Sequence, residues 1–147
     1  MNEDTEKIVA ENSEPFAGSK LSASAGKQDD LTYRIIGAAM AVHSALGSGF
    51  FERVYENALC HEFVKRGIRY ERQKRYRVEY DGVDVGEMTV DLVVEDQVIV
   101  ELKARREPHS VTEAQVIGYL KAAGLKRGLV INFNVRSLKS GIKRISA

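Results

Sequence analysis

The chain has 147 residues, of which 44% are hydrophobic and 29% are charged, and its formal net charge is +1. This size and composition predict one globular domain with a buried core, and no apolar run approaches the roughly 18–20 residues that a membrane span requires. Cys60 is the single cysteine, which excludes a disulfide framework and a cysteine-based zinc site.

Residues 1–30 predict a disordered tail, because they are rich in Ser, Glu, Ala, Gly and Lys and lack sustained periodicity. Charged residues at the start take the place of the apolar region of a secretory signal. We therefore expect a cytoplasmic protein, with Cys60 reduced and buried as a small apolar residue. The folded domain is expected to span residues 31–147.

A first helix is predicted over residues 31–46, where apolar residues dominate and where Asp29 or Asp30 offers an N-cap. The two glycines of Gly47-Ser48-Gly49 end it. His43 lies within this apolar helix. A histidine that is satisfied in the core or at an interface is favoured at this position over a catalytic base.

A second helix is predicted over residues 51–66, with Gly67 as its C-terminal glycine. Its apolar residues recur at the i, i+3, i+4 and i+7 spacing of one helix face, so this face is expected to be buried. The residues of the predicted buried face are Phe51, Val54, Tyr55, Ala58, Leu59 and Phe63.

Three strands are predicted next, over residues 68–80, 83–94 and 98–104. Asp81-Gly82 is a typical turn dipeptide, so the first two strands are expected to form a hairpin. Aromatic and β-branched residues recur along all three segments, which is the composition that favours strands over helices.

A third helix is predicted over residues 111–123, after Glu107-Pro108 ends the preceding strand. Ser110 is its expected N-cap, and Glu113 stands at the position of a capping-box partner. Gly124 is expected to end the helix.

The last part of the chain predicts a short buried strand over residues 128–133, and residues 142–145 form either a strand or a short helix. The step from the strand at 98–104 to the strand at 128–133 needs a crossover helix, so these two strands are expected to be parallel neighbours. The order α, α, β, β, β, α, β predicts an α/β fold of the α+β kind, a mixed sheet with helices packed against it.

The most informative segment is residues 90–103, which reads VDLVVEDQVIVELK. Its apolar runs indicate strands covered on both faces, and charges in such strands are costly unless they are paired or bind an ion. Glu101 and Lys103 are two residues apart, so they point to the same face of a strand. If Asp91 joins them, two carboxylates and a lysine suit a hard divalent cation such as Mg²⁺. A solvated edge hairpin with a surface ion pair is the alternative.

Whether Asp91 joins this pair depends on the turn between the two apolar runs. A loop with an odd number of residues centred on Asp96 would set Asp91 opposite Glu101. A two-residue loop at Glu95-Asp96 would instead pair Asp91 with Val100 and send Glu101 to the other face. The sequence leaves both registers open.

Charge is distributed unevenly along the chain. Residues 81–100 carry six acidic residues and no Lys or Arg, whereas residues 61–80 carry seven basic and three acidic residues. Residues 101–147 carry ten basic and three acidic residues. A metal site that acts on a polyanion needs an acidic centre with basic flanks. On charge alone, however, solvated residues that share no common face are the favoured explanation.

The heptapeptide Gly49-Phe50-Phe51-Glu52-Arg53-Val54-Tyr55 reads G-x-x-E-x-x-Y. Together with the acidic and lysine residues of segment 90–103, it resembles the bacterial GxxExxY proteins of the PD-(D/E)XK nuclease-like superfamily. The resemblance continues through VELKA at residues 100–104 and AQVIGYLKAAGLKRGLVINF at residues 114–133. It covers roughly residues 31–146 and implies a restriction-endonuclease-like αβββαβ core with helices flanking a mixed sheet.

The resemblance also implies roles for individual residues. Asp91 and Glu101 would bind Mg²⁺, with Mn²⁺ as a substitute, and the backbone carbonyl of Leu102 would complete the protein ligands. Lys103 would orient the attacking water or stabilise negative charge in the transition state. Glu52 resembles an acidic residue that superfamily members often place near the metal, and it is a further candidate ligand. A glutamate on the helix surface is the alternative for this position.

Three more residues belong to the implied surroundings of the site. Tyr55 shares a helix face with Glu52 and either bonds it or packs in the core, and packing is favoured. Gln115 and Tyr119 are four residues apart on one helix face, and some superfamily nucleases carry a similar Q-x-x-x-Y pair. Gln115 would contact a metal-bound water or a phosphate, and Tyr119 would have a secondary role.

These residues predict a metal-dependent nuclease that hydrolyses phosphodiester bonds by direct attack of water. Nucleic acid is the expected partner, with DNA favoured over RNA. Because no separate recognition module is present, a homodimer or a protein partner is also considered. One alternative is a nuclease-fold module that binds nucleic acid or protein with little or no catalysis, and another is an enzyme for a small phosphorylated substrate. The sequence has no G-x-S-x-G and no GxxxxGK[ST] motif, and it offers only one cysteine for a Cys/His pair, so no other catalytic signal is strong.

Overall fold

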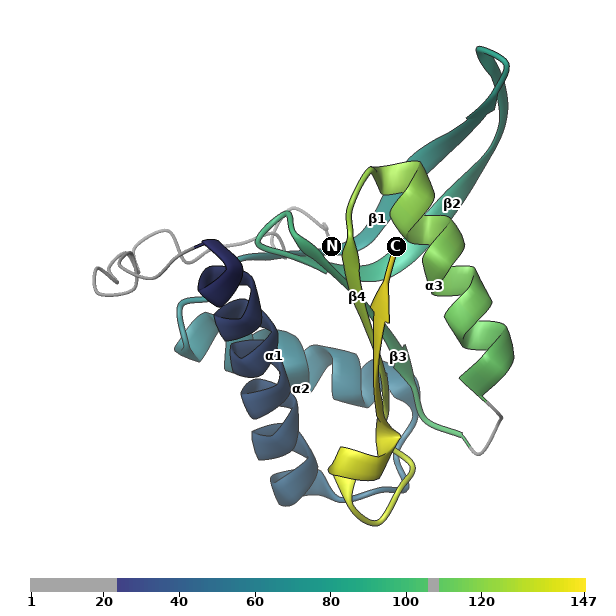
Figure 1. The fold of residues 1–147 in the computed structure, drawn as a ribbon. Helices are drawn as coiled ribbons and strands as arrows, with labels where there is room; N and C mark the ends of the chain where they lie inside the picture. Colours follow the sequence, from purple (N-terminus) through teal and green to yellow (C-terminus); the bar gives the residue numbers. More distant parts are fainter. Residues whose placement is uncertain (1–23, 106–108) are drawn as a thin grey trace.

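The computed structural model describes residues 24–105 and 109–147, and the side chains of residues 30–105 and 112–147 (Figure 1). The described chain contains α-helices, β-strands and one short 3₁₀ helix, η4. In chain order the elements are α1 (Ser24–Leu46), α2 (Glu52–Lys65), β1 (Tyr70–Tyr80), β2 (Val83–Val94), β3 (Val98–Lys103), α3 (His109–Ala123), β4 (Arg127–Asn132), η4 (Leu138–Gly141) and β5 (Ile142–Ser146).

The strands form one mixed sheet in the order β1-β2-β3-β4-β5. β3 and β4 are parallel and are joined by α3, which confirms the predicted crossover, and the other neighbouring strands are antiparallel. Residues 142–145 lie in β5, so the strand alternative is confirmed for them. Figure 1 shows α1 and α2 on one side of the sheet and α3 on the other. The predicted α+β arrangement of helices flanking a mixed sheet is confirmed.

The sheet separates two hydrophobic cores. One contains side chains of α1 and α2, such as Ile35 and Phe63, and the other contains Val116 and Leu120 of α3. The apolar residues around the β2–β3 turn are all buried: Val93, Val94, Val98, Ile99, Val100 and Leu102. The central strands are therefore covered on both faces, and the edge-hairpin alternative is wrong. Within the described residues, no helix has the length and hydropathy to cross a membrane.

The turn between β2 and β3 fixes the register of the central strands. It has three residues, 95–97, and the ladder pairs Val94 with Val98 and Leu92 with Val100. The odd-numbered loop predicted as one of two alternatives is therefore confirmed, and the two-residue loop is wrong. This register carries the two candidate carboxylates to opposite positions on neighbouring strands.

The first helix begins at Ser24, seven residues earlier than predicted. Asp29 and Asp30 lie within α1, so their predicted role as N-cap is wrong. Asp30 is exposed, and an aspartate within a helix costs little when water solvates its side chain. The part of the predicted tail that spans residues 24–30 is helical, and residues 1–23 lie outside the described chain.

α2 and α3 end next to the predicted glycines, but α3 does not begin at its predicted N-cap. Gly67 and Gly124 have φ of 70° and 71°, the left-handed conformation that commonly ends a helix. α3 begins at His109, so Ser110 lies inside the helix and is not its N-cap. The predicted strand end at Glu107-Pro108 lies outside the described residues.

The buried face of α2 differs from the predicted one. Phe51 is 85% exposed and precedes the helix, and Val54 is 38% exposed. Glu56 and Cys60 are buried instead, beside apolar residues that the spacing did predict. A count of apolar residues cannot find a buried glutamate, because its burial depends on a partner from another element.

The outer parts of β1 and β2 project beyond the helices as a long hairpin (Figure 1). Asp81 and Gly82 have φ of 58° and 77° and form its turn, as predicted. Tyr80, Val83 and Val85 near this turn are exposed. The hairpin therefore presents side chains far from the two cores.

Candidate functional site

Asp91, Glu101 and Lys103 meet where the β2–β3 ladder ends. The ladder between these strands ends at the pair of Leu92 and Val100. Beyond it, the backbone N–H of Leu102 donates to Asp91 Oδ2 at 2.8 Å. Lys103 Nζ lies 3.8 Å from Glu101 Oε2. The structure therefore brings the three predicted residues together at the end of the β2–β3 ladder, with Asp91 inside β2 and Lys103 at the end of β3. Asp91 and Glu101 are called the acid pair below.

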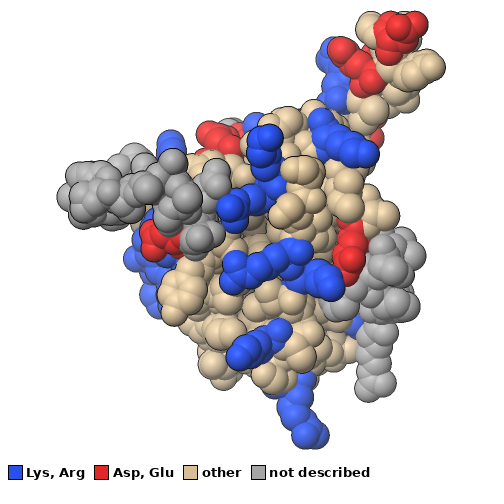
Figure 2. Space-filling view, viewed as in Figure 1, with Lys and Arg blue, Asp and Glu red and all other residues tan. Residues whose placement is uncertain are grey.

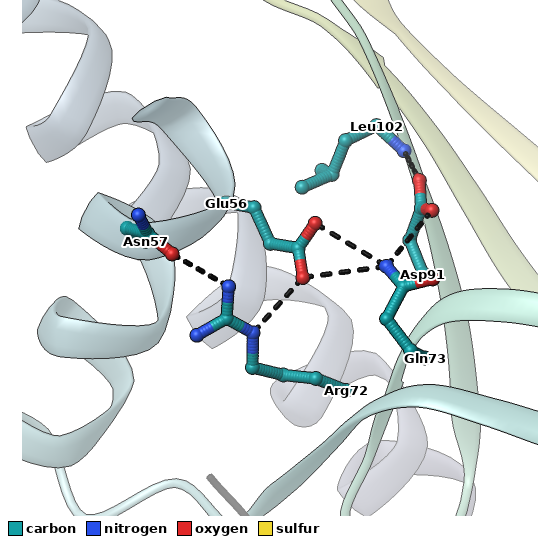
Figure 3. A network of polar contacts seen from close by, with 6 residues as sticks. All are labelled: Glu56, Asn57, Arg72, Gln73, Asp91 and Leu102. Carbon is teal, nitrogen blue, oxygen red and sulfur yellow. Dashed lines mark hydrogen bonds and ion pairs between the residues drawn. The ribbon is translucent and has the colours of Figure 1, made fainter. Parts of the chain in front are cut away.

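A polar network holds Asp91 from the side of β1 and α2 (Figure 3). The β1–β2 pairing skips Gln73, whose φ is 49°. Gln73 Nε2 donates to Asp91 Oδ1 at 3.5 Å and to both carboxylate oxygens of Glu56 at 3.4 Å. Arg72 donates from Nε to Glu56 Oε2 at 2.9 Å and from Nη2 to Asn57 Oδ1 at 2.6 Å. The network thus ties α2 to β1 directly beside the acid pair.

The sequence-based prediction missed Glu56, Arg72 and Gln73. Glu56 is only 6% exposed, and Arg72 compensates its charge, because an unpaired buried carboxylate would be strongly destabilising. One feature of the sequence indicates its place: Glu56 follows Glu52 by one helical turn, so the two share a face of α2. The role of Gln73 depends on an irregularity of β1, which no local pattern predicts.

Burial dominates the electrostatics of the acid pair. It raises the pKa of the Glu101 carboxyl to about 8, and the neighbouring Asp91 charge acts in the same direction. Burial also raises the pKa of Asp91, against the hydrogen bond from the Leu102 backbone. Tyr119 of α3 is 6% exposed, and burial, with the charges of the acid pair, raises the pKa of its hydroxyl to about 12. Tyr119 therefore lies within electrostatic range of both carboxylates.

The oxygen atoms of this site fit a hard divalent cation. Glu101 Oε1 is buried and has no hydrogen-bond partner among the described residues, which is unfavourable unless another ligand completes it. Asp91 adds carboxylate oxygens, and such ligands suit Mg²⁺. Within the described residues, no group of three or more His, Cys, Asp and Glu side chains is arranged to hold a metal. A cation would therefore rest on the acid pair together with backbone or water oxygens.

The other predicted residues differ in their relation to the acid pair. Glu52 is the first residue of α2, and its charge contributes to the raised pKa of both acids, so it lies within electrostatic range. Gln115 is exposed on α3 and makes no side-chain hydrogen bond within the described chain, so its role stays a prediction. His43 is 9% exposed, and its Nε2 lies 2.9 Å from the Val135 carbonyl oxygen, which confirms a satisfied core histidine.

Tyr55, the last residue of the G-x-x-E-x-x-Y motif, holds the loop that contains the glycine of the motif. Its ring is fully buried, and its hydroxyl donates to the Gly47 carbonyl at 2.5 Å and accepts the Phe50 backbone N–H at 3.2 Å. Gly49 has φ of 114°, a conformation that side chains other than glycine rarely adopt. Tyr55 therefore packs in the core, as favoured, and its hydroxyl fixes the loop that leads into Glu52.

Replacing Tyr55 with Phe is expected to lower the free energy of unfolding by about 1–2 kcal/mol, because two hydrogen bonds to the loop are lost while the ring remains. Urea denaturation measures this change. Tyr80→Phe is the matched control, since that tyrosine is 74% exposed on the hairpin, and it should leave stability unchanged. Equal stability of the two variants would contradict the assigned role of the Tyr55 hydroxyl.

An αβββαβ core with a mixed sheet, and with two carboxylates and a lysine side by side on two neighbouring central strands, defines the restriction-endonuclease-like class of proteins. In agreement, a family model described as the PD-(D/E)XK nuclease superfamily matches residues 29–145, from within α1 to β5. The chain belongs to the PD-(D/E)XK nuclease superfamily. No curated protein and no solved structure matches the chain.

Proposed function

We propose that the protein is a metal-dependent nuclease, of the GxxExxY kind, that hydrolyses phosphodiester bonds by direct attack of water. The observation that carries this proposal is the buried Glu101 Oε1 beside Asp91 and Lys103, which has no hydrogen-bond partner in the described part of the chain. A protein that only binds its partner has no need of an incompletely satisfied carboxylate at this position, because such an atom costs stability.

The proposed roles follow from the position of each side chain. Asp91 and Glu101 would hold Mg²⁺, or Mn²⁺ in its place, together with the Leu102 carbonyl, and Glu52 is a further candidate ligand. When bound, such a cation supplies positive charge that stabilises a phosphate transition state and acidifies a water. The Lys103 ammonium is largely buried, with its side chain 18% exposed, and it would orient the water or donate to a phosphate oxygen.

The distribution of basic residues supports a polyanionic substrate. Residues 121–147 carry seven Lys and Arg residues and no acidic residue. Figure 2 shows Lys and Arg side chains spread over the face on which β5 lies in front, with the largest group of acidic side chains at the hairpin tip and smaller ones near the edges of this face. Cations of this kind neutralise phosphates without reading sequence. We therefore propose nucleic acid as the substrate, with DNA expected before RNA.

A cleavage assay on a mixed panel tests this function. The panel contains linear, supercoiled, branched and single-stranded DNA and RNA, each incubated with Mg²⁺, Mn²⁺ or EDTA. Cleavage that requires the metal is the expected result, and it would also identify the substrate. If nothing is cleaved, calorimetry with Mg²⁺ and Mn²⁺ follows. Absence of both cleavage and metal binding would overturn the proposal and favour a nuclease-fold binding module.

A further inference from the structure

The loop that precedes α2 exposes two phenylalanine rings although its backbone is firmly held. Phe50 is 45% exposed and Phe51 is 85% exposed. The Tyr55 hydroxyl bonds both ends of the loop, and the Phe50 ring meets the Tyr55 ring edge to face, with centroids 6.1 Å apart. Large exposed apolar side chains on an ordered loop are typical of binding sites. Without a ligand, the protein fixes these side chains in place but gains no buried apolar surface.

The same rings are connected to the lysine of the site. The Tyr55 ring stacks on Phe133, with centroids 4.4 Å apart and an angle of 6° between the planes. The Phe133 backbone N–H donates to the Lys103 carbonyl at 2.8 Å. A column of three rings, Phe50, Tyr55 and Phe133, therefore runs from solvent to the end of β3. The exposed loop is fixed in position relative to the residues that would cleave the phosphodiester.

The surroundings of the loop carry the charges that a nucleic acid would meet. Phe51 directly precedes Glu52, whose charge acts on the acid pair. His43, four residues before the start of this loop, bonds the Val135 carbonyl, and the segment that follows Val135 carries the exposed Arg136 and Lys139. An aromatic surface beside basic side chains is the arrangement that binds unpaired bases and their phosphates. A protein segment that covers the rings would draw no advantage from the adjacent acid pair.

We propose that the loop of Phe50 and Phe51 stacks on an unpaired base of the substrate, next to the phosphodiester that is cleaved. This inference rests on the proposed nuclease function and specifies its substrate. The protein then prefers single-stranded, frayed or flapped nucleic acid over an intact duplex, because a base must leave its stack to reach the rings. Phe51 offers the most accessible face, and Phe50 extends the ring column.

Binding without cleavage tests the proposal. The full chain is titrated in EDTA with a labelled single-stranded oligonucleotide and with the duplex of the same sequence. Base stacking on an aromatic side chain contributes about 1–3 kcal/mol, so Phe51→Ala should weaken single-strand binding about fivefold to 150-fold. Duplex binding should change less than about twofold. Phe51→Tyr retains the aromatic face and should bind like the unmodified chain, and Tyr80→Ala, on the distant hairpin, should have no effect.

The outcomes separate this inference from the nuclease function. If Phe51→Ala binds single strands as tightly as the unmodified chain, or loses single-strand and duplex binding equally, the stacking site is wrong, and a protein partner for the loop becomes the better explanation. Metal-dependent cleavage by the unmodified chain would leave the nuclease function standing in that case. If the unmodified chain neither binds nor cleaves any nucleic acid, both proposals fail.

Discussion

Asp91→Asn is expected to abolish metal-dependent cleavage, with a loss of about 10³-fold or more, because one charged ligand of the proposed cation site disappears and several kcal/mol of transition-state stabilisation go with it. The fold should persist. The asparagine Oδ1 atom can still accept the Leu102 N–H. A neutral side chain also avoids the cost of burying a negative charge, the same cost that raises the pKa of Asp91. Cleavage rates and thermal melting, measured on the same samples, separate the two effects.

The control for this variant lies five residues away, in the turn between β2 and β3. Asp96→Asn makes the identical chemical change at an exposed turn position, where φ is 57° and asparagine is well tolerated. It should leave cleavage unchanged. Lys103→Ala is expected to lose cleavage as Asp91→Asn does. Full metal-dependent activity in Asp91→Asn would show that the acid pair is not the catalytic site.

The second large effect concerns stability. The pKa of Glu101 is raised to about 8, whereas the unfolded chain holds it near 4.5, so the folded protein binds the extra proton between these values. The contribution of Glu101 to the free energy of unfolding of the metal-free protein should therefore be greatest below pH 4.5. It should fall as the pH rises toward 8, by at most about 1.4 kcal/mol per pH unit. Glu101→Gln removes the titrating group, so it should be the more stable protein at pH 8 and yet be inactive.

Urea denaturation in EDTA between pH 5 and pH 8 measures this dependence. Glu79→Gln is the control, because it makes the same change at an exposed position of the hairpin and should keep the slope of the unmodified chain. Parallel pH profiles for Glu101→Gln and the unmodified chain would refute the assignment of the slope to Glu101. Added Mg²⁺ should reduce the difference at pH 8, since a cation bound only to the folded state stabilises it.

Sequence reasoning was most successful where a local pattern has one physical cause. Buried valines on both sides of the turn predicted central strands, and the crossover requirement predicted the parallel pairing of β3 with β4. Helix starts were predicted less well. Ser110 and Asp30 are good capping residues, but the neighbouring residues also permit helix, and a cap is favourable without being obligatory.

The site was predicted in part, for a related reason. Asp91, Glu101 and Lys103 are visible in the sequence because charges interrupt apolar strands. Glu56 and Gln73 were not found, because their contribution depends on contact between α2 and an irregular point of β1. Phe51 was predicted to be buried by its spacing, whereas it lies before the helix and faces solvent. Helical periodicity has no meaning for a residue outside the helix.

The three-residue turn between β2 and β3 has a consequence for how this chain can change during evolution. Exposed turn residues such as Asp96 can be exchanged freely as long as the left-handed backbone is tolerated. Their number cannot change, because the side chains of a strand alternate between faces. Loss or gain of a single residue at 95–97 would leave Glu101 and Lys103 facing away from Asp91. Here an insertion or deletion is more damaging than almost any substitution, although the centre of the turn lies five residues from either acid.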